Sequence, residues 1–127
     1  MTAIILDAGA FIAIERNDRA TVALLKAAQK SSLPLRSNGG VVAEVWRGGS
    51  GNQVPLARFL NAVELLAVDG ELGRSAGVLI RDAGSGSAID ATVVAIARQG
   101  DQVVTSDPDD IQLLVNSSGR SIKIITC

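Results

Sequence analysis

The chain has 127 residues, of which 47% are apolar, and its formal net charge is −1. This length is typical of one domain, here residues 1–127, with a core that needs no disulfide or structural metal. The sequence has no histidine and a single cysteine, Cys127, which excludes Ser-His-Asp catalysis, Cys-His catalysis and histidine-ligated zinc. Because Phe11, Trp46 and Phe59 are the only aromatic residues, an aromatic platform that stacks single-stranded bases is not expected either.

The sequence gives no sign of membrane association. No apolar run approaches the roughly 20 residues of a membrane span, and the N-terminus lacks the basic start and small-residue cleavage site of a secretory signal. A lone cysteine is compatible with a reducing compartment. We therefore expect a cytoplasmic protein.

Hydrophobic patterning predicts strands that alternate with helices. A strand buried on both faces is expected at residues 3–6, because this run is wholly apolar, and a short helix follows it. Further strands are predicted at 33–37, 63–68, 102–106 and 122–126, and helices at 19–30, 39–47, 55–61, 71–83, 87–98 and 108–118. Asp18 and Asn38 are expected to cap two of the helices, and the glycine-rich residues 48–52 to form a flexible loop. Since helices separate the strands, we predict an α/β fold with a five-stranded, mainly parallel sheet and helices on both faces.

Four acidic residues lie in apolar surroundings or at turns between strands and helices: Asp7, Glu44, Asp90 and Asp107. Each has a simple structural explanation when taken alone. Asp7 and Asp107 can cap the helices that follow them, Asp90 has capping-box spacing from Ser87, and Glu44 can be a surface glutamate. None of these residues singly predicts a functional site.

Taken together, the four acids predict a metal site. The carboxyl ends of parallel strands lie along one edge of a sheet, so the residues that follow the first and fourth strands are expected to converge there. Two carboxylates about 5 Å apart repel each other by roughly 3 kcal/mol at an effective dielectric constant of about 20, so such a cluster needs protons or a cation. Oxygen ligands without His or Cys select Mg²⁺ or Mn²⁺ over zinc. A metal-activated water that attacks a phosphodiester is the chemistry available without histidine.

The segments Ile4–Asp7, Ala43–Gly48, Ile89–Ala97 and Val104–Ile111 resemble, in order and context, the motifs of PIN-domain ribonucleases, above all the VapC-type toxins of bacterial toxin–antitoxin pairs. The resemblance extends over nearly the whole chain. It implies a PIN-like three-layer fold, an endoribonuclease that depends on Mg²⁺ or Mn²⁺, and products with a 5′-phosphate and a 3′-hydroxyl. It further implies RNA as substrate, a homodimer, and a VapB-type antitoxin that inserts into the catalytic groove.

The resemblance also implies roles for individual residues. Asp7, Asp90 and Asp107 are similar to the metal ligands of the family, Glu44 to the acid that helps to hold the metal or its water, and Asp110 to the acid that closes the last motif. Thr105 matches the hydroxyl residue of that motif. The family often has Ser or Thr just after its first Asp, whereas Ala8 and Gly9 stand here.

Basic residues near these motifs are candidates for contact with RNA or antitoxin. Arg47 is preferred because it is close to Glu44 in sequence, and Arg16 and Thr105 are further candidates. Two alternative functions remain open at this point. One is a phospho-acceptor receiver-like domain, in which Asp69 is the candidate acceptor. The other is a catalytically inactive PIN-like binding module, which is expected to bind no divalent ion at the four acids.

Overall fold

A computed structural model of the chain describes residues 2–48 and 51–127 and shows one five-stranded sheet. The strands are β1 (Ile4–Leu6), β2 (Leu35–Asn38), β3 (Glu64–Leu66), β4 (Gln102–Thr105) and β5 (Lys123–Thr126). Their order is β3-β2-β1-β4-β5, and all neighbouring strands are parallel. The strand order reverses beside the buried central strand β1, so the topological switch point, where ligands bind in such sheets, lies between β1 and β4.

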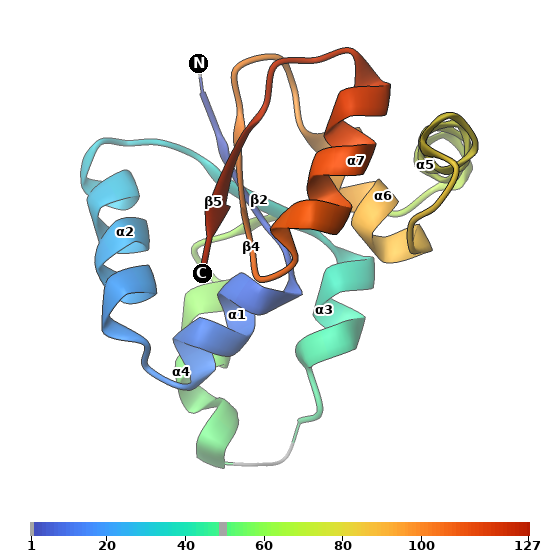
Figure 1. The fold of residues 1–127 in the computed structure, drawn as a ribbon. Coiled ribbons are helices and arrows are strands. Elements are labelled where there is room, and N and C mark those ends of the chain that lie inside the picture. The colour runs from blue at the N-terminus through green and yellow to red at the C-terminus, as the bar shows by residue number, and fades with distance from the viewer. Residues whose placement is uncertain (1, 49–50) are drawn as a thin grey trace.

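Helices cover both faces of this sheet (Figure 1). On one side, α2 (Arg19–Lys30) and α4 (Val54–Leu60) each contact α1 (Ala8–Glu15). On the other side, α5 (Gly70–Ala83), α6 (Ala88–Ile96) and α7 (Pro108–Ser118) contact one another. The short helix α3 (Gly39–Val45) contacts both α1 and α6. The predicted α/β fold with three layers is therefore confirmed.

Most helix ends lie where the sequence predicts them. The Asp18 carboxylate accepts the Thr21 N–H at 3.0 Å at the start of α2, and Asn38 caps α3. Two helices are shorter than predicted, because the backbone turns to extended conformations at Trp46 after α3 and at Ala97 after α6. Elsewhere the boundaries differ by one or two residues, as is usual for helix and strand ends.

The predicted glycine-rich loop at 48–52 is only partly described. Residues 51 and 52 belong to a 3₁₀ turn, η1 (Gly51–Gln53), whereas residues 49 and 50 lie outside the described part of the chain. The buried Gln53 side chain accepts hydrogen bonds from the Arg47 and Gly48 N–H groups at 2.8 and 2.9 Å, and it donates to the Val45 carbonyl and the Glu15 carboxylate. The Gly48 end of the segment is thereby fixed to the Gln53 side chain.

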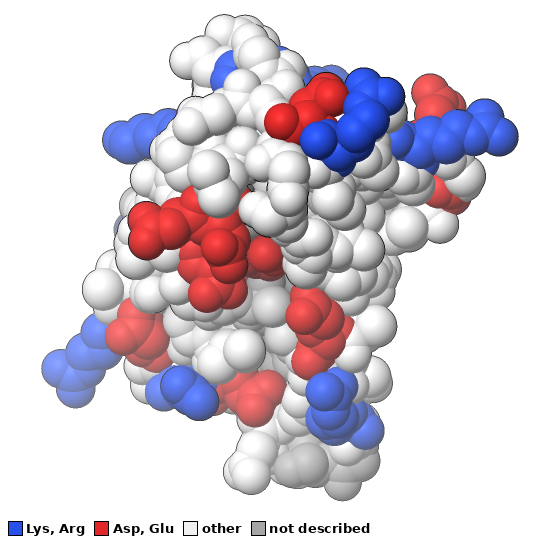
Figure 2. Space-filling view, turned by 45° about the vertical axis from the view of Figure 1, so that its right-hand side comes forward, with Lys and Arg blue, Asp and Glu red and all other residues white. Residues whose placement is uncertain are grey.

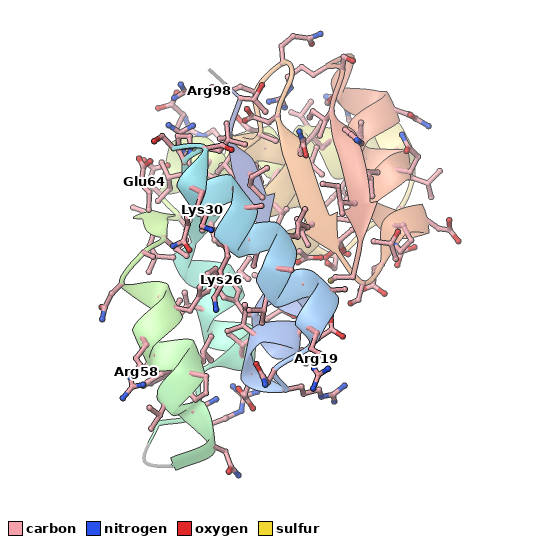
Figure 3. All side chains as sticks on the ribbon, turned by 90° about the vertical axis from the view of Figure 1, so that its left-hand side faces the viewer. Arg19, Lys26, Lys30, Arg58, Glu64 and Arg98 are labelled. Atoms are coloured by element: carbon pink, nitrogen blue, oxygen red, sulfur yellow. The ribbon has the colours of Figure 1, made fainter. Side chains whose placement is uncertain are left out.

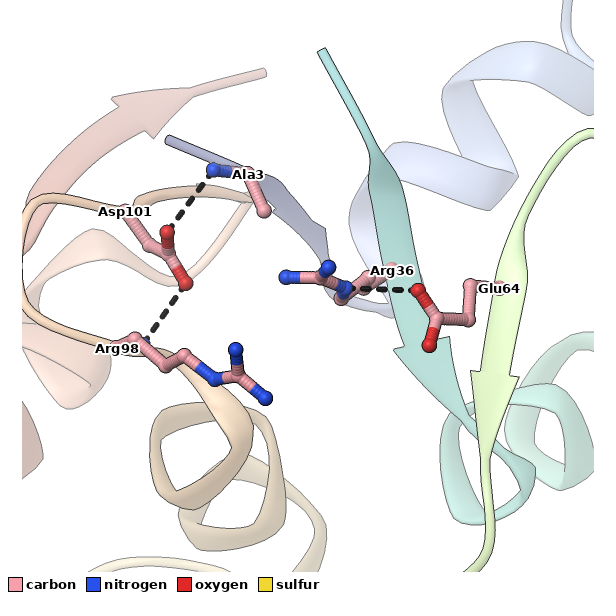
Figure 4. A network of polar contacts seen from close by, with 5 residues as sticks. All are labelled: Ala3, Arg36, Glu64, Arg98 and Asp101. Atoms are coloured by element: carbon pink, nitrogen blue, oxygen red, sulfur yellow. Dashed lines mark hydrogen bonds and ion pairs between the residues drawn. The ribbon is translucent and has the colours of Figure 1, made fainter. Parts of the chain in front are cut away.

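A buried carboxylate joins the beginning of β1 to the turn between α6 and β4 (Figure 4). Asp101 is 1% exposed, and its two oxygens accept the Ala3 N–H at 2.9 Å and the Arg98 N–H at 2.8 Å. Next to this turn, Arg36 of β2 and Glu64 of β3 form an ion pair at 2.8 Å. The amino ends of the strands are therefore connected by polar contacts as well as by the sheet.

The strand order contradicts the receiver-like alternative. Receiver domains have the order 2-1-3-4-5, which places the third strand beside the first. Here β3 is the edge strand, and Asp69 after it caps α5 by accepting the Leu72 N–H at 2.9 Å. Within the described ranges, no helix is long and apolar enough to cross a membrane.

Candidate active site

Asp7 lies at the carboxyl end of the central strand and caps α1. Its Oδ1 atom accepts the Ala8 N–H at 2.8 Å, and its Oδ2 atom accepts the Thr105 hydroxyl at 2.7 Å. The residue is 3% exposed. Because a carboxylate offers about four lone-pair sites, these two hydrogen bonds leave acceptor capacity for a cation. Capping and metal binding are therefore compatible at Asp7.

Thr105 connects Asp7 to Asp107 across the switch point. Its hydroxyl donates to Asp7 and accepts the Asp107 N–H at 3.0 Å, and the residue is fully buried at the end of β4. Asp107 stands at the N-cap position of α7, yet its side chain makes no capping hydrogen bond. The expected capping role of the Asp107 carboxylate is thus wrong, and its oxygens are not used by the helix.

Glu44 and Asp90 come from the two helices beside these strand ends. Glu44 is exposed on α3, yet partial loss of solvent around its carboxyl raises its pKa, and the charges of Asp7 and Asp107 raise it further. The pKa of Asp90 is raised to about 6, mainly by burial and the charge of Asp7, with smaller contributions from Asp107 and Glu44 and an opposing one from the hydrogen bond with Ser87. Loss of solvent and nearby negative charge both raise the pKa of a carboxyl group, because each disfavours its ionised form.

These mutual effects show that the structure brings Asp7, Glu44, Asp90 and Asp107 together. Figure 2 shows acidic side chains gathered in a dense group on one face of the molecule. The two ion pairs recorded for the described residues, Arg36–Glu64 and Arg81–Asp82, involve none of the four acids. The negative charge of the cluster is therefore not compensated by an ion pair within the described part of the chain.

The donor set fits a hard divalent cation. All four side chains offer oxygen atoms, which Mg²⁺ and Mn²⁺ prefer, and a bound cation offsets the repulsion that raises the Glu44 and Asp90 pKa values. As they stand, no three Asp, Glu or Cys side chains in the described ranges form a cluster tight enough to hold a metal ion. The four acids thus supply the chemistry for a metal site, and the ligand geometry itself stays a prediction.

The raised Asp90 pKa predicts how stability depends on pH in the metal-free protein. Asp90 binds its proton more tightly in the folded state, at a pKa of about 6, than in the unfolded chain. Its contribution to the free energy of unfolding is therefore fully present at low pH and is lost as the pH rises from about 4 through 6. Asp90→Asn is expected to remove this dependence and raise the melting temperature at pH 7.5 by several degrees, as measured by circular dichroism in EDTA.

The control for this prediction is Asp82→Asn, which changes an exposed carboxylate of α5 that is paired with Arg81. This variant is expected to keep the pH profile of the wild type. An Asp90 carboxyl carbon that titrates near pH 4 by NMR in the metal-free protein contradicts the prediction. Added Mg²⁺ is expected to lower the apparent pKa of Asp90, because metal ligands must be deprotonated.

The other predicted contact residues lie around this cluster. Asp110 is exposed in the first turn of α7, close to Asp107. Arg16 is exposed after α1 and lines a depression together with Gly9, Ser106 and Cys127. The guanidinium of Arg47 donates to the carbonyls of Ala43, Glu44 and Trp46 and so closes the end of α3. Contact of Arg16, Arg47 or Thr105 with RNA or antitoxin stays a prediction.

The structure explains why position 9, the second after Asp7, has no side chain. A Cβ atom at Gly9 would lie 2.4 Å from the Ser106 hydroxyl oxygen and 2.8 Å from the Ser106 backbone nitrogen. The Ser106 side chain therefore occupies the space in which a serine at position 9 would begin. Any residue larger than glycine at position 9 has to displace the turn that carries Asp107.

Sequence reasoning missed the buried polar residues at the end of β2. Ser37 is fully buried and donates to the Leu6 carbonyl at 2.7 Å, directly before Asp7. Asn38 is also fully buried, and beyond its capping role it donates to the Thr92 hydroxyl at 3.1 Å. The sequence contains a signal for them, because Ser37 and Asn38 stand at the carboxyl end of β2 just as Asp7 stands after that of β1.

Comparison with known proteins identifies the fold. No protein-family model matches the sequence, and no curated protein matches it. The structure is similar to a chain in the crystal structure of VapBC2 from Rickettsia felis bound to a DNA fragment from their promoter, with a TM-score of 0.72 and 16% sequence identity. The match covers 100% of this chain and 99% of that chain. The structure therefore shares its fold with this chain over its whole length, in agreement with the resemblance predicted from the sequence.

Proposed function

We propose that this protein is an endoribonuclease that depends on Mg²⁺ or Mn²⁺ and acts as the toxin of a VapBC-type toxin–antitoxin pair. The observation that carries the proposal is the position of Asp7 and Asp107 at the topological switch point, where Thr105 joins them by hydrogen bonds. Burial and the charges of these two acids raise the pKa values of Glu44 and Asp90 beside them. The match to a chain of VapBC2, with almost complete coverage of both chains, supports the assignment to this class.

The residues have distinct roles in the proposed reaction. Asp7, Asp90 and Asp107 would hold the cation, with Glu44 assisting and Asp110 as a possible additional ligand. A bound Mg²⁺ or Mn²⁺ supplies an activated water and neutralises charge on the phosphodiester. The Thr105 hydroxyl donates its proton to the Asp7 carboxylate and accepts the Asp107 N–H at its oxygen, so it orients both residues. Protons compete with the cation for Asp90, whose pKa in the metal-free protein is raised to about 6, so activity is expected to fall as the pH is lowered and to persist to lower pH at higher metal concentration.

The test is cleavage of total cellular RNA by the purified protein with Mg²⁺, with Mn²⁺ and with EDTA. The expected result is cleavage with either metal, none with EDTA, and fragments that carry a 5′-phosphate and a 3′-hydroxyl. Sequencing of the fragment ends identifies the RNA class and the cut site. Binding of Mn²⁺ without any cleavage contradicts the enzymatic role, and absence of Mn²⁺ binding favours the inactive PIN-like binding module.

A groove between α2 and α4 supports an antitoxin as partner. It has a volume of about 510 Å³ and is lined by apolar side chains that include Val22, Leu25 and Phe59, with Lys26 and Arg58 among its polar ones. Figure 3 shows Lys26, Lys30 and Arg58 on this side of the molecule. An amphipathic helix fits an apolar groove with its hydrophobic face, and acidic residues at its edges complement the cations. We propose that a VapB-type antitoxin places such a helix here.

Charge reversal of Lys26 and Arg58 tests this partner. The double variant Lys26→Glu, Arg58→Glu is expected to bind its cognate antitoxin about 10-fold more weakly, because edge charges steer and orient the partner. Its RNA cleavage is expected to match that of the wild type, since neither residue belongs to the acidic cluster. Isothermal titration calorimetry measures the affinity, and unchanged binding argues against the groove as the antitoxin site.

We further propose that the protein is cytoplasmic and forms a homodimer. Cell fractionation tests the location, and sedimentation tests the oligomeric state.

A further inference from the structure

The two residues that end β2 form hydrogen bonds with three of the elements that carry the acidic cluster, those of Asp7, Glu44 and Asp90. Ser37 donates to the Leu6 carbonyl, and Leu6 directly precedes Asp7. The Asn38 side-chain oxygen accepts the Gly40 and Val41 N–H groups at 2.9 and 3.1 Å and so caps α3, the helix that carries Glu44. Its amide nitrogen donates to the Thr92 hydroxyl of α6, the helix that carries Asp90.

Thr92 is a fixed partner for this amide. The residue is 5% exposed, and its hydroxyl donates to the Ile89 carbonyl at 2.6 Å while it accepts the Asn38 amide. The hydroxyl therefore has one donor bond and one acceptor bond, and its position is set by α6 itself. A buried amide with this arrangement has little freedom to change partner.

The contact between α3 and α6 is also close. A Cβ atom at Gly40 would lie 2.8 Å from the Cδ1 atom of Ile89, so only glycine fits there without a shift. The first turn of α3 thus packs directly on the residue that precedes Asp90. The hydrogen bond from Asn38, the cap of α3, to Thr92 of α6 lies near this same contact.

We propose that Asn38 is a positioning residue of the active site, which fixes the separation of Glu44 and Asp90 through its hydrogen bond to Thr92. This inference rests on the proposed metal-dependent function. It assigns to that site a residue that is not a metal ligand and that does more than cap α3. Partners of metal ligands typically contribute 10- to 100-fold to metal affinity or activity. Asn38 and Thr92 act on the proposed ligands only through the backbone of α3 and α6, so loss of their bond is expected to have an effect at the lower end of this range, about 10-fold.

Two variants separate the positioning role from capping and stability. Asn38→Ser keeps a side-chain oxygen that can cap α3 but is too short to reach Thr92. Thr92→Val keeps the shape of the side chain and removes the hydroxyl. The matched control is Thr21→Val, which removes another buried threonine hydroxyl, bonded to Asp18 at 2.7 Å on α2. Each variant is assayed well below its measured melting temperature.

The readouts are Mn²⁺ affinity, from the electron paramagnetic resonance signal of free Mn²⁺, and the kcat and KM of RNA cleavage. Asn38→Ser and Thr92→Val are each expected to weaken Mn²⁺ binding about 10-fold and to lower kcat at saturating metal with KM unchanged. The double variant is expected to lose no more than either single variant, because both remove one bond. Thr21→Val is expected to lower the melting temperature by a similar amount and to leave Mn²⁺ affinity and kcat unchanged.

Wild-type values in Asn38→Ser and Thr92→Val, with an active wild type, overturn the positioning role and leave the proposed function intact. An equal loss in Thr21→Val also overturns it, because the effect then follows stability alone. A wild type that neither binds Mn²⁺ nor cleaves RNA overturns the proposed function and this inference with it.

Discussion

Asp7→Asn is expected to lower the rate of RNA cleavage about 100-fold or more and to leave the fold intact. Asparagine has nearly the shape of aspartate, and its side-chain oxygen can still accept the Ala8 N–H that Asp7 accepts at 2.8 Å. Its amide nitrogen can donate to the Thr105 hydroxyl oxygen, in place of the bond that this hydroxyl donates to Asp7. Among the charges of the acidic cluster, that of Asp7 raises the pKa values of Glu44 and Asp90 the most, and the substitution removes this charge. It thereby removes a negative ligand from the proposed cation, and each factor of ten in rate corresponds to about 1.4 kcal/mol.

The measurements for Asp7→Asn are initial rates with Mg²⁺ and Mn²⁺, together with a melting curve in EDTA. Asp18→Asn is the matched control, because Asp18 also caps a helix, α2, through its carboxylate. Asp18→Asn is expected to cleave RNA like the wild type. Equal rates for Asp7→Asn and the wild type contradict the proposed reaction. Loss of the far-ultraviolet circular dichroism signal of the variant indicates instead that the charge is needed for folding.

Asp101→Asn is expected to produce the largest loss of stability among single conservative changes. Both carboxylate oxygens of Asp101 accept backbone N–H groups in a site that is 1% exposed. The amide nitrogen of asparagine cannot accept, so either the Ala3 or the Arg98 N–H is left without its partner. A buried polar group without a partner costs about 1–3 kcal/mol, and more where the lost acceptor was charged. We therefore expect Asp101→Asn to lower the free energy of unfolding by about 3 kcal/mol.

Urea denaturation of Asp101→Asn in EDTA measures this cost at constant metal content. The control is Asp69→Asn, which changes an exposed capping carboxylate that accepts one N–H, from Leu72. Asparagine is as good a cap as aspartate, so this control is expected to stay within about 0.5 kcal/mol of the wild type. A loss below about 1 kcal/mol in Asp101→Asn shows that Ala3 and Arg98 find other partners.

Much of the fold was predictable because local signals and topology agree. The buried strand before Asp7, the caps at Asp18 and Asn38 and the glycine after α5 are all readable from short segments of sequence. Parallel topology then predicted that Asp7 and Asp107 lie together, and the structure shows them bridged by Thr105. The helix ends at Val45 and Ile96 were not predictable, because no Gly or Pro marks them and tertiary packing decides where the backbone turns.

The parts of the site that escaped prediction depend on contacts between distant segments. The Asn38 cap is a local pattern, whereas its bond to Thr92 links residues 54 positions apart. The close approach of Gly9 to Ser106 is likewise visible only in three dimensions. Periodicity and capping rules contain no information on such pairs, so a sequence can indicate that a buried polar residue matters without indicating its partner.

The hydrogen bond between Thr105 and Asp7 has a consequence for the order of events during synthesis. Its two residues are 98 positions apart, and the same separation holds for the bond between Asp101 and Ala3. The central strand β1 is therefore synthesised well before β4, its neighbour on one side. At about 5–20 residues per second, β1 waits roughly 5–20 s for that partner. The site in which Thr105 joins Asp7 to Asp107 can assemble only after β4 has been made.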